Sequence, residues 1–168
     1  MSTGELDIVS GPRLEHRGHV PTLGIRETVP FRTMLANRDR LLAELIRWLA
    51  DHGVEPAGHF FLRLHVVNMS DLMDIEVGAS GVTNTGDGRV QAGSLPAGDY
   101  AVLAYRAKSM AANRRLHDWV REQGLVLDTS PHPTGEAFAS RCEIYLTDPR
   151  TEQRKTRWVV ELAFMTRS

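Results

Sequence analysis

Hydrophobic and polar positions alternate near the end of the chain, and this alternation predicts a β-strand over 141–147. Cys142 and Ile144 fall on one face of the strand, while Glu143 and Tyr145 fall on the other. We expect the apolar face to lie against a packing layer and the polar face to carry a site. The simpler alternative is a solvated outer face, on which Glu143 only pairs with an arginine.

Two other stretches have apolar residues at helical spacing. The first runs over 33–52 and is followed by Gly53, and the second runs over 109–123 and is followed by Gly124; glycine is common just after a helix ends. Further strands are predicted at 6–9, 14–26, 60–67, 73–77, 100–106 and 158–164.

The second half of this pattern repeats the first. The segment beginning at Trp48 resembles the one beginning at Trp119, an offset of 119 − 48 = 71, and the segment at His65 resembles the one at Tyr145, an offset of 145 − 65 = 80. Two such copies, each about half the chain, indicate a duplicated unit rather than a solenoid.

We therefore predict an α+β fold of duplicated strand-helix-strand-strand units with pseudo-twofold symmetry. The expected antiparallel sheet has its helices on one face and a central pocket at the junction of the halves. The half-repeats span about 6–78 and 94–165 of a single domain over 1–168, and a glycine-rich linker over 79–93 joins them.

Composition excludes several classes of protein. A chain of 168 residues with 42% hydrophobic residues can bury a core, which argues against disorder. A net charge of −1 without a basic run argues against direct binding of nucleic acid. No stretch approaches the roughly 20 apolar residues of a membrane span, so we expect a cytoplasmic protein. The single cysteine, Cys142, excludes a disulfide framework and is expected to be a small core residue.

Four stretches resemble one known family, the GyrI-like small-molecule-binding domain, also called the AraC-type effector-binding domain. They lie at 95–102, 116–119, 141–149 and 158–164. The resemblance covers about 6–164 and implies paired strand-helix-strand-strand units with an aromatic-lined central pocket that holds one acid. Glu143 stands at the position of that acid.

The chain departs from the family pattern in two places. Family members commonly have a glycine just after the strand that matches 100–105, whereas this chain has Arg106, Ala107 and Lys108. The family's transcription regulators also carry a helix-turn-helix domain ahead of the pocket domain. Only a few residues precede the first predicted strand here, so we expect a stand-alone pocket domain.

An acid buried among aromatic rings is costly unless it takes up a proton or meets a positive ligand. A cationic, apolar molecule suits both the acid and the rings. The aromatic residues that we expect around Glu143 are Tyr100, Tyr145, Phe138, Trp119 and Phe61. Trp119 also fits a plain core position. Arg63, on a strand face that the duplication makes equivalent, is a candidate to neutralise Glu143, in which case a neutral or anionic ligand fits.

The predicted function is binding of hydrophobic, cationic small molecules, for sensing or sequestration. The alternative is a hydrolase that opens strained rings, such as the cyclopropanes of toxic natural products, with Glu143 as general base and Tyr145 or Tyr100 as proton donor. The sequence does not separate the two. No cofactor is expected, and no metal, since the seven histidines form no pair at helical metal-ligand spacing. Relatives imply a separate regulator protein as a partner.

Overall fold

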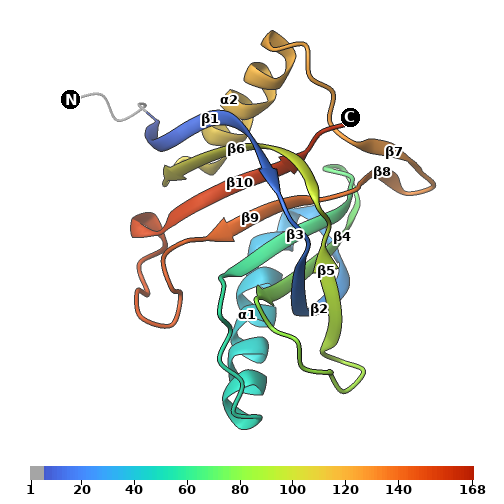
Figure 1. Ribbon diagram of the computed structural model, residues 1–168. Helices are drawn as coiled ribbons and strands as arrows, with labels where there is room; N and C mark the ends of the chain where they lie inside the picture. Colours follow the sequence, from blue (N-terminus) through green and yellow to red (C-terminus); the bar gives the residue numbers. More distant parts are fainter. Residues whose placement is uncertain (1–5) are drawn as a thin grey trace.

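The structure, a computed structural model, describes residues 6–168, which form one large sheet and two α-helices (Figure 1). The strands are β1 (Asp7–Arg17), β2 (Val20–Pro30), β3 (Phe60–Val67), β4 (Leu72–Ser80), β5 (Gln91–Leu95), β6 (Gly98–Arg106), β7 (Thr129–His132), β8 (Gly135–Phe138), β9 (Arg141–Tyr145) and β10 (Val159–Met165). The helices are α1 (Met34–Asp51) and α2 (Ser109–Glu122).

The main strands lie in the order β1-β6-β10-β9-β3-β4-β2-β5, and each neighbouring pair is antiparallel. Read from its two ends, this order is symmetric: β6, β10 and β9 on one side correspond to β2, β4 and β3 on the other. The two halves meet where β9 pairs with β3, which we call the seam. This arrangement confirms the predicted α+β class.

The two outermost strands are exchanged between the halves. β1 precedes β2 in the chain but pairs with β6, and β5 precedes β6 but pairs with β2. The half-repeat proposed at 6–78 therefore includes a strand that completes the other half of the sheet. β5 overlaps the end of the predicted linker. The strand was not predicted because five extended residues without an apolar run leave little signal in the sequence.

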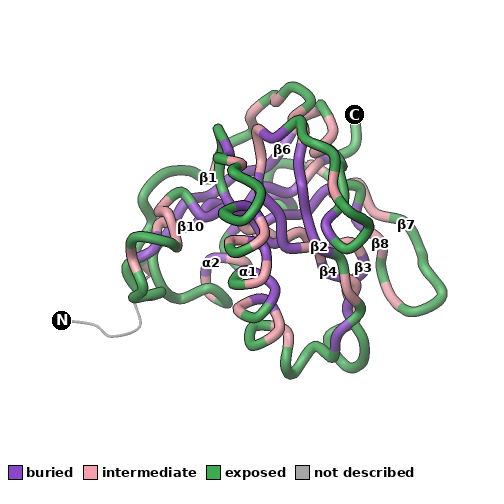
Figure 2. The backbone as a smooth tube through the Cα atoms, turned by 90° about the horizontal axis from the view of Figure 1, so that it is seen from below, coloured by how far each residue is buried: buried purple, intermediate pink, exposed green. Residues whose placement is uncertain are grey.

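Both helices cover the same face of the sheet. α1 packs mainly on β2 and β4, and α2 mainly on β6 and β1, so that the central strands lie between them. Leu45 and Leu49 of α1 and Leu116 of α2 are buried in one hydrophobic core with alternate residues of the strands. Figure 2 shows that the buried residues run along the strands, while the loops are largely exposed.

The other face of the sheet has a smaller apolar cluster, centred on Phe61, Tyr100 and Ile144. Across residues 6–168, neither helix is long and apolar enough to cross a membrane.

The turn from β6 into α2 has left-handed backbone at two residues that are not glycine. Ala107 has φ 49° and Lys108 has φ 50°. These residues stand where the GyrI-like pattern commonly has glycine, so the chain keeps a turn that suits glycine while placing side chains in it. A left-handed residue with a Cβ costs about 1–2 kcal/mol.

We expect Ala107→Gly to raise the free energy of unfolding by about 0.5–1 kcal/mol, because the relief of backbone strain exceeds the added freedom of the unfolded chain. The matched control is Ala111→Gly in the first turn of α2, which should lower it by about 0.5–1 kcal/mol. Urea denaturation measures both. A loss of stability in both variants would mean that position 107 carries no strain.

Candidate functional site

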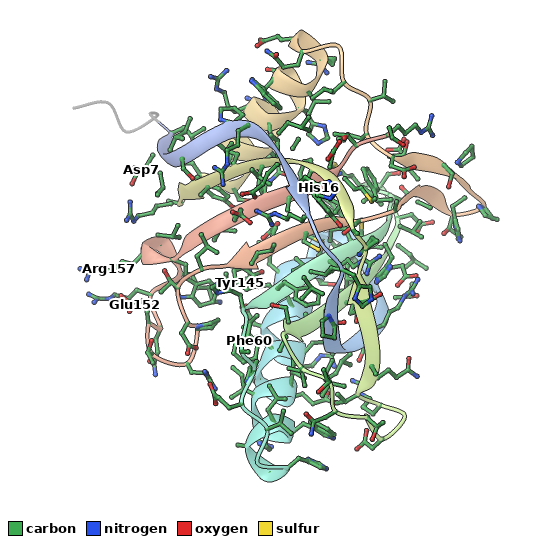
Figure 3. The ribbon with its side chains drawn as sticks, in the orientation of Figure 1. Asp7, His16, Phe60, Tyr145, Glu152 and Arg157 are labelled. Atoms are coloured by element: carbon green, nitrogen blue, oxygen red, sulfur yellow. The ribbon has the colours of Figure 1, made fainter. Side chains whose placement is uncertain are left out.

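The orientation of β9 decides which side chains can form a site. Glu143 lies opposite Leu162 on one side and Leu62 on the other, and both leucines belong to the core beneath the helices. Tyr145 faces the same way, beside its register partner Phe60 on β3 (Figure 3). The polar face of the strand is thus the face that the helices cover.

Cys142 and Ile144 point to the helix-free face instead, where they join the smaller apolar cluster. Both are buried there, so the apolar face of the strand is packed as expected, but it does not face the helices. Alternation shows which residues share a face, but both faces of a central strand are covered here, so it does not show which one meets the helices.

Four polar side chains on the helix-covered face interact electrostatically with Glu143: Arg38, Tyr105, Arg141 and Tyr145. We call these five residues the seam cluster. Tyr105 and Tyr145 are brought onto one row because both pair with Val160 of β10. Tyr145 packs at 5.2 Å between ring centroids from Trp158, which closes one side of the cluster.

Arg38 enters the cluster from the start of α1 and is only 8% exposed. Its Nη1 lies 3.4 Å from the hydroxyl of Tyr145, to which it donates. The guanidinium carbon lies 5.7 Å from the centre of the Tyr145 ring and 5.9 Å from that of the Trp158 ring. A cation held over two aromatic rings is favoured by their negative faces. Arg38 also donates to Asp39 at 2.8 Å.

Arg141 is the second buried cation, at 5% exposed. Its guanidinium carbon lies 4.8 Å from the Phe138 ring centre and 4.6 Å from that of Phe164, so that it is stacked between two rings. Nη2 donates to Asn113 at 3.3 Å, whereas Nε has no hydrogen-bond partner among residues 6–168. Burial lowers the pKa of Arg141 to about 10, against the opposing charge of Glu143.

Glu143 itself is half-buried, and its carboxylate makes no hydrogen bond or ion pair within the described part of the chain. Burial raises the pKa of this carboxyl above its ordinary value, and the charges of Arg38 and Arg141 act in the opposite direction. Burial, with the charge of Glu143, also raises the pKa of Tyr105 to about 12. The cluster thus holds an acid with raised proton affinity beside neutral tyrosines.

The structure does not bring all the predicted site residues together. Tyr100 and Phe61 lie in the helix-free cluster, on the face opposite Glu143. Arg63 faces that side too and donates to the carbonyl oxygens of Ser94 at 2.9 Å and Ala139 at 2.8 Å. It does not neutralise Glu143; the cations that act on Glu143 are Arg38 and Arg141.

An error of one residue in the offset of the sequence repeat explains why Arg63 was expected on the same face as Glu143. The offset of 80 equates Arg63 with Glu143, whereas the register places Leu62 opposite Glu143 and on the same face. Because side chains alternate, a slip of one residue moves every side chain to the other face.

Two further predicted residues lie on the helix-covered side. Phe138, at the end of β8, stacks against Arg141. Trp119 of α2 is partly buried against the main core, as the plainer interpretation of its spacing expected.

Arg38, Tyr105 and Arg141 were missed from the sequence. Arg38 carried a signal, because it stands four residues after Met34 and three before Leu41 on the apolar stripe of α1. Arg141 shares the alternating face of Glu143. Tyr105 had no such signal, since its place depends on the pairing of three strands.

A separate cavity of about 460 Å³ opens on the helix-free face. Tyr100, Cys142 and Ile144 contribute to its wall, together with the connections between β1 and β2 and between β5 and β6. Glu143 and Tyr145 do not line it.

Comparison with known proteins places this fold. No protein-family model and no curated protein matches the sequence. Among solved structures, EcmrR in its complex with DNA aligns with a TM-score of 0.66 at 15% identity, covering 93% of this chain and 57% of that one. SAV2435 bound to tetraphenylphosphonium aligns with a TM-score of 0.60 at 13% identity, covering 93% of each chain.

A hydrolase from Listeria innocua aligns with a TM-score of 0.53 at 12% identity, covering 93% of this chain and 92% of that one. This chain therefore spans little more than half of the EcmrR chain, but nearly all of the other two. At such low identity the likeness concerns the fold alone. The chain has the fold shared by EcmrR and SAV2435, which is the GyrI-like fold that the sequence predicted.

Proposed function

We propose that this protein binds hydrophobic, cationic small molecules at the seam cluster, with Glu143 as the counter-ion. The observation that carries the proposal is the half-buried carboxylate of Glu143, which has no hydrogen-bond or ion-pair partner among residues 6–168 although the charges of Arg38 and Arg141 act on it. A carboxylate that is partly exposed and unpaired can be reached by a cationic ligand, which would supply the missing partner. The cation bound to SAV2435, which shares the fold, is consistent with this chemistry.

Arg38 occupies the place that a ligand cation would take, over the rings of Tyr145 and Trp158. A cationic ligand must therefore displace it. Arg38 already donates to Asp39 through Nε and Nη2, and Asp39 also pairs with Lys155. We propose that Arg38 gives up its hydrogen bond to Tyr145 and keeps only Asp39 when a ligand enters, so that the contact with Tyr145 lowers the affinity of the site for cations.

Glu143→Gln should weaken the binding of tetraphenylphosphonium about tenfold, because opposite charges about 4 Å apart attract by about 1–4 kcal/mol between water and a protein surface, and about 1.4 kcal/mol is a factor of ten. Arg38→Met should strengthen it by a similar factor, since a competing cation is removed while an unbranched, flexible apolar side chain remains. Isothermal titration calorimetry at fixed salt measures both.

The matched control for these variants is Glu122→Gln, an exposed acid at the end of α2, which should leave the affinity unchanged. Equal losses in Glu143→Gln and Glu122→Gln would rule out Glu143 as the counter-ion. An unchanged affinity in Arg38→Met would show that Arg38 does not compete with the ligand.

The same affinity should depend on pH in a defined direction. Glu143 attracts a cation only when ionised, and burial raises its pKa above that of an ordinary glutamic acid. The affinity for tetraphenylphosphonium should therefore rise with pH, with a midpoint above about 4.3, the usual value for glutamic acid. Titrations between pH 4 and 8 would reveal the midpoint, and Glu143→Gln should abolish the dependence. A midpoint at or below the ordinary value would argue against a desolvated carboxyl.

A second candidate is a hydrolase of strained rings such as cyclopropanes. It is favoured by one observation: a carboxyl with raised proton affinity lies beside the hydroxyl of Tyr145, which Arg38 holds by a hydrogen bond. Glu143 would take a proton from water as the hydroxide adds to a ring carbon. The ring C–C bond breaks, and the carbon that leaves takes a proton from Tyr145, which regains it from Glu143.

If this reaction occurs, incubation with cyclopropane-bearing electrophilic natural products should yield a product heavier by one water, detected by mass spectrometry. Glu143→Gln and Tyr145→Phe should each reduce the rate by about 10²–10⁴-fold, the usual contribution of a positioned acid or base. Stabilisation against heat without a product would support binding alone, because a ligand stabilises the folded state whether or not it is consumed.

A further inference from the structure

We propose that the cavity on the helix-free face is a second ligand site, for an uncharged, mainly apolar small molecule that carries one hydrogen-bonding group. This inference goes beyond the proposed function, since the cavity shares none of its wall with the seam cluster. Its volume of about 460 Å³ falls within the roughly 300–1,000 Å³ of small-molecule pockets.

Strand exchange builds this cavity. Its floor is the helix-free face of the central strands, including Ile144 of β9 and Ala163 of β10. Its sides come from the two connections that pass between the halves, with Gly18 before β2 and Pro96 before β6. Most of the wall is apolar, so the occupant must offer apolar surface of its own.

The charged groups of the wall are already paired. Arg17 lies 2.7 Å from Glu161 and 2.6 Å from Glu15, and the side chain of Glu161 is only 11% exposed. The guanidinium carbon of Arg17 also lies 5.9 Å from the centre of the Tyr100 ring. Because the cation and its carboxylates satisfy one another, neither Arg17 nor Glu161 is free to attract an ion, and the remaining basic residue of the lining, His59, is exposed. An uncharged ligand fits best.

One polar group of the wall is left without a partner. Ser140 is 2% exposed, and its hydroxyl makes no hydrogen bond within the described residues. Tyr100, which also lines the cavity, already donates its hydroxyl to the carbonyl oxygen of Pro96 at 2.6 Å. Leaving a buried hydroxyl unpaired costs about 1–3 kcal/mol. A ligand group that donates to or accepts from Ser140 would recover that cost.

The uncharged dye N-phenyl-1-naphthylamine provides the test, because it is apolar and its single N–H can donate to the Ser140 hydroxyl. Its fluorescence should rise on binding and saturate at one dye per chain. Ser140→Ala should weaken binding about threefold to tenfold, the value of one hydrogen bond. Ala163→Leu should weaken it further by filling the floor, whereas Glu143→Gln should leave it unchanged.

The only cysteine gives an independent readout at the site itself. Cys142 lies in the cavity wall and is buried, so its alkylation by N-ethylmaleimide should be slow, and it should be slower still with the dye bound. Tetraphenylphosphonium, directed to the other face, should not protect it. This measurement holds on the wild-type protein even if Ala163→Leu fails to fold.

Three outcomes would overturn the second site. They are the absence of saturable dye binding, loss of dye binding in Glu143→Gln with no effect of Ser140→Ala, and alkylation of Cys142 at the same rate with and without the dye. The proposals for the two sites can be rejected independently of each other. Loss of tetraphenylphosphonium binding would leave the dye results standing, and the reverse also holds.

Discussion

The antiparallel pairing of β3 with β9 is the contact on which the rest of this structure depends. It joins two strand-helix-strand-strand units into one sheet and sets which residues face the helices. Because the helices pack on the outer strands of each half, the seam is the place where a polar side chain can reach the helix-covered face without displacing a helix. Glu143 stands at that place. The reverse side of the same strands forms the floor of the cavity.

The electrostatics of the seam differ from those of a lone acid in an apolar pocket. Arg38 and Arg141 both act on Glu143, but neither forms an ion pair with it. Arg141 is held between two aromatic rings, whereas Arg38 lies over two rings and also pairs with Asp39. Rings hold a guanidinium without neutralising it, so Arg141 keeps its charge in reach of Glu143. Such a site responds to the charge of an entering ligand, because any movement of Arg38 or Arg141 changes the balance of positive and negative charge around Glu143.

The sequence predicted the periodic elements well and the assembly of the site only in part. α1 and α2 were predictable because a 3.6-residue period over several turns has few alternatives, and the bounds of β3 were predicted as observed. Which face of β9 meets the helices was not predictable, since Cys142 and Tyr145 are both buried. The charge near Glu143 was assigned to Arg63, although Arg38 supplies it. Arg38 is held there by its hydrogen bond to Tyr145, which joins residues 107 positions apart, and only the fold brings them together.

The exchange of β1 and β5 between the two halves resembles an exchange of strands between two separate subunits. Each half borrows its outer strand from the other, which is the arrangement of a domain-swapped dimer. Here the two partners are consecutive parts of one polypeptide, joined through residues 81–90. A single-unit ancestor that assembled as a swapped pair would have had two identical surfaces at its symmetry axis. Within one chain the two surfaces need not be identical, and here the acid Glu143 on β9 stands opposite the apolar Leu62 on β3.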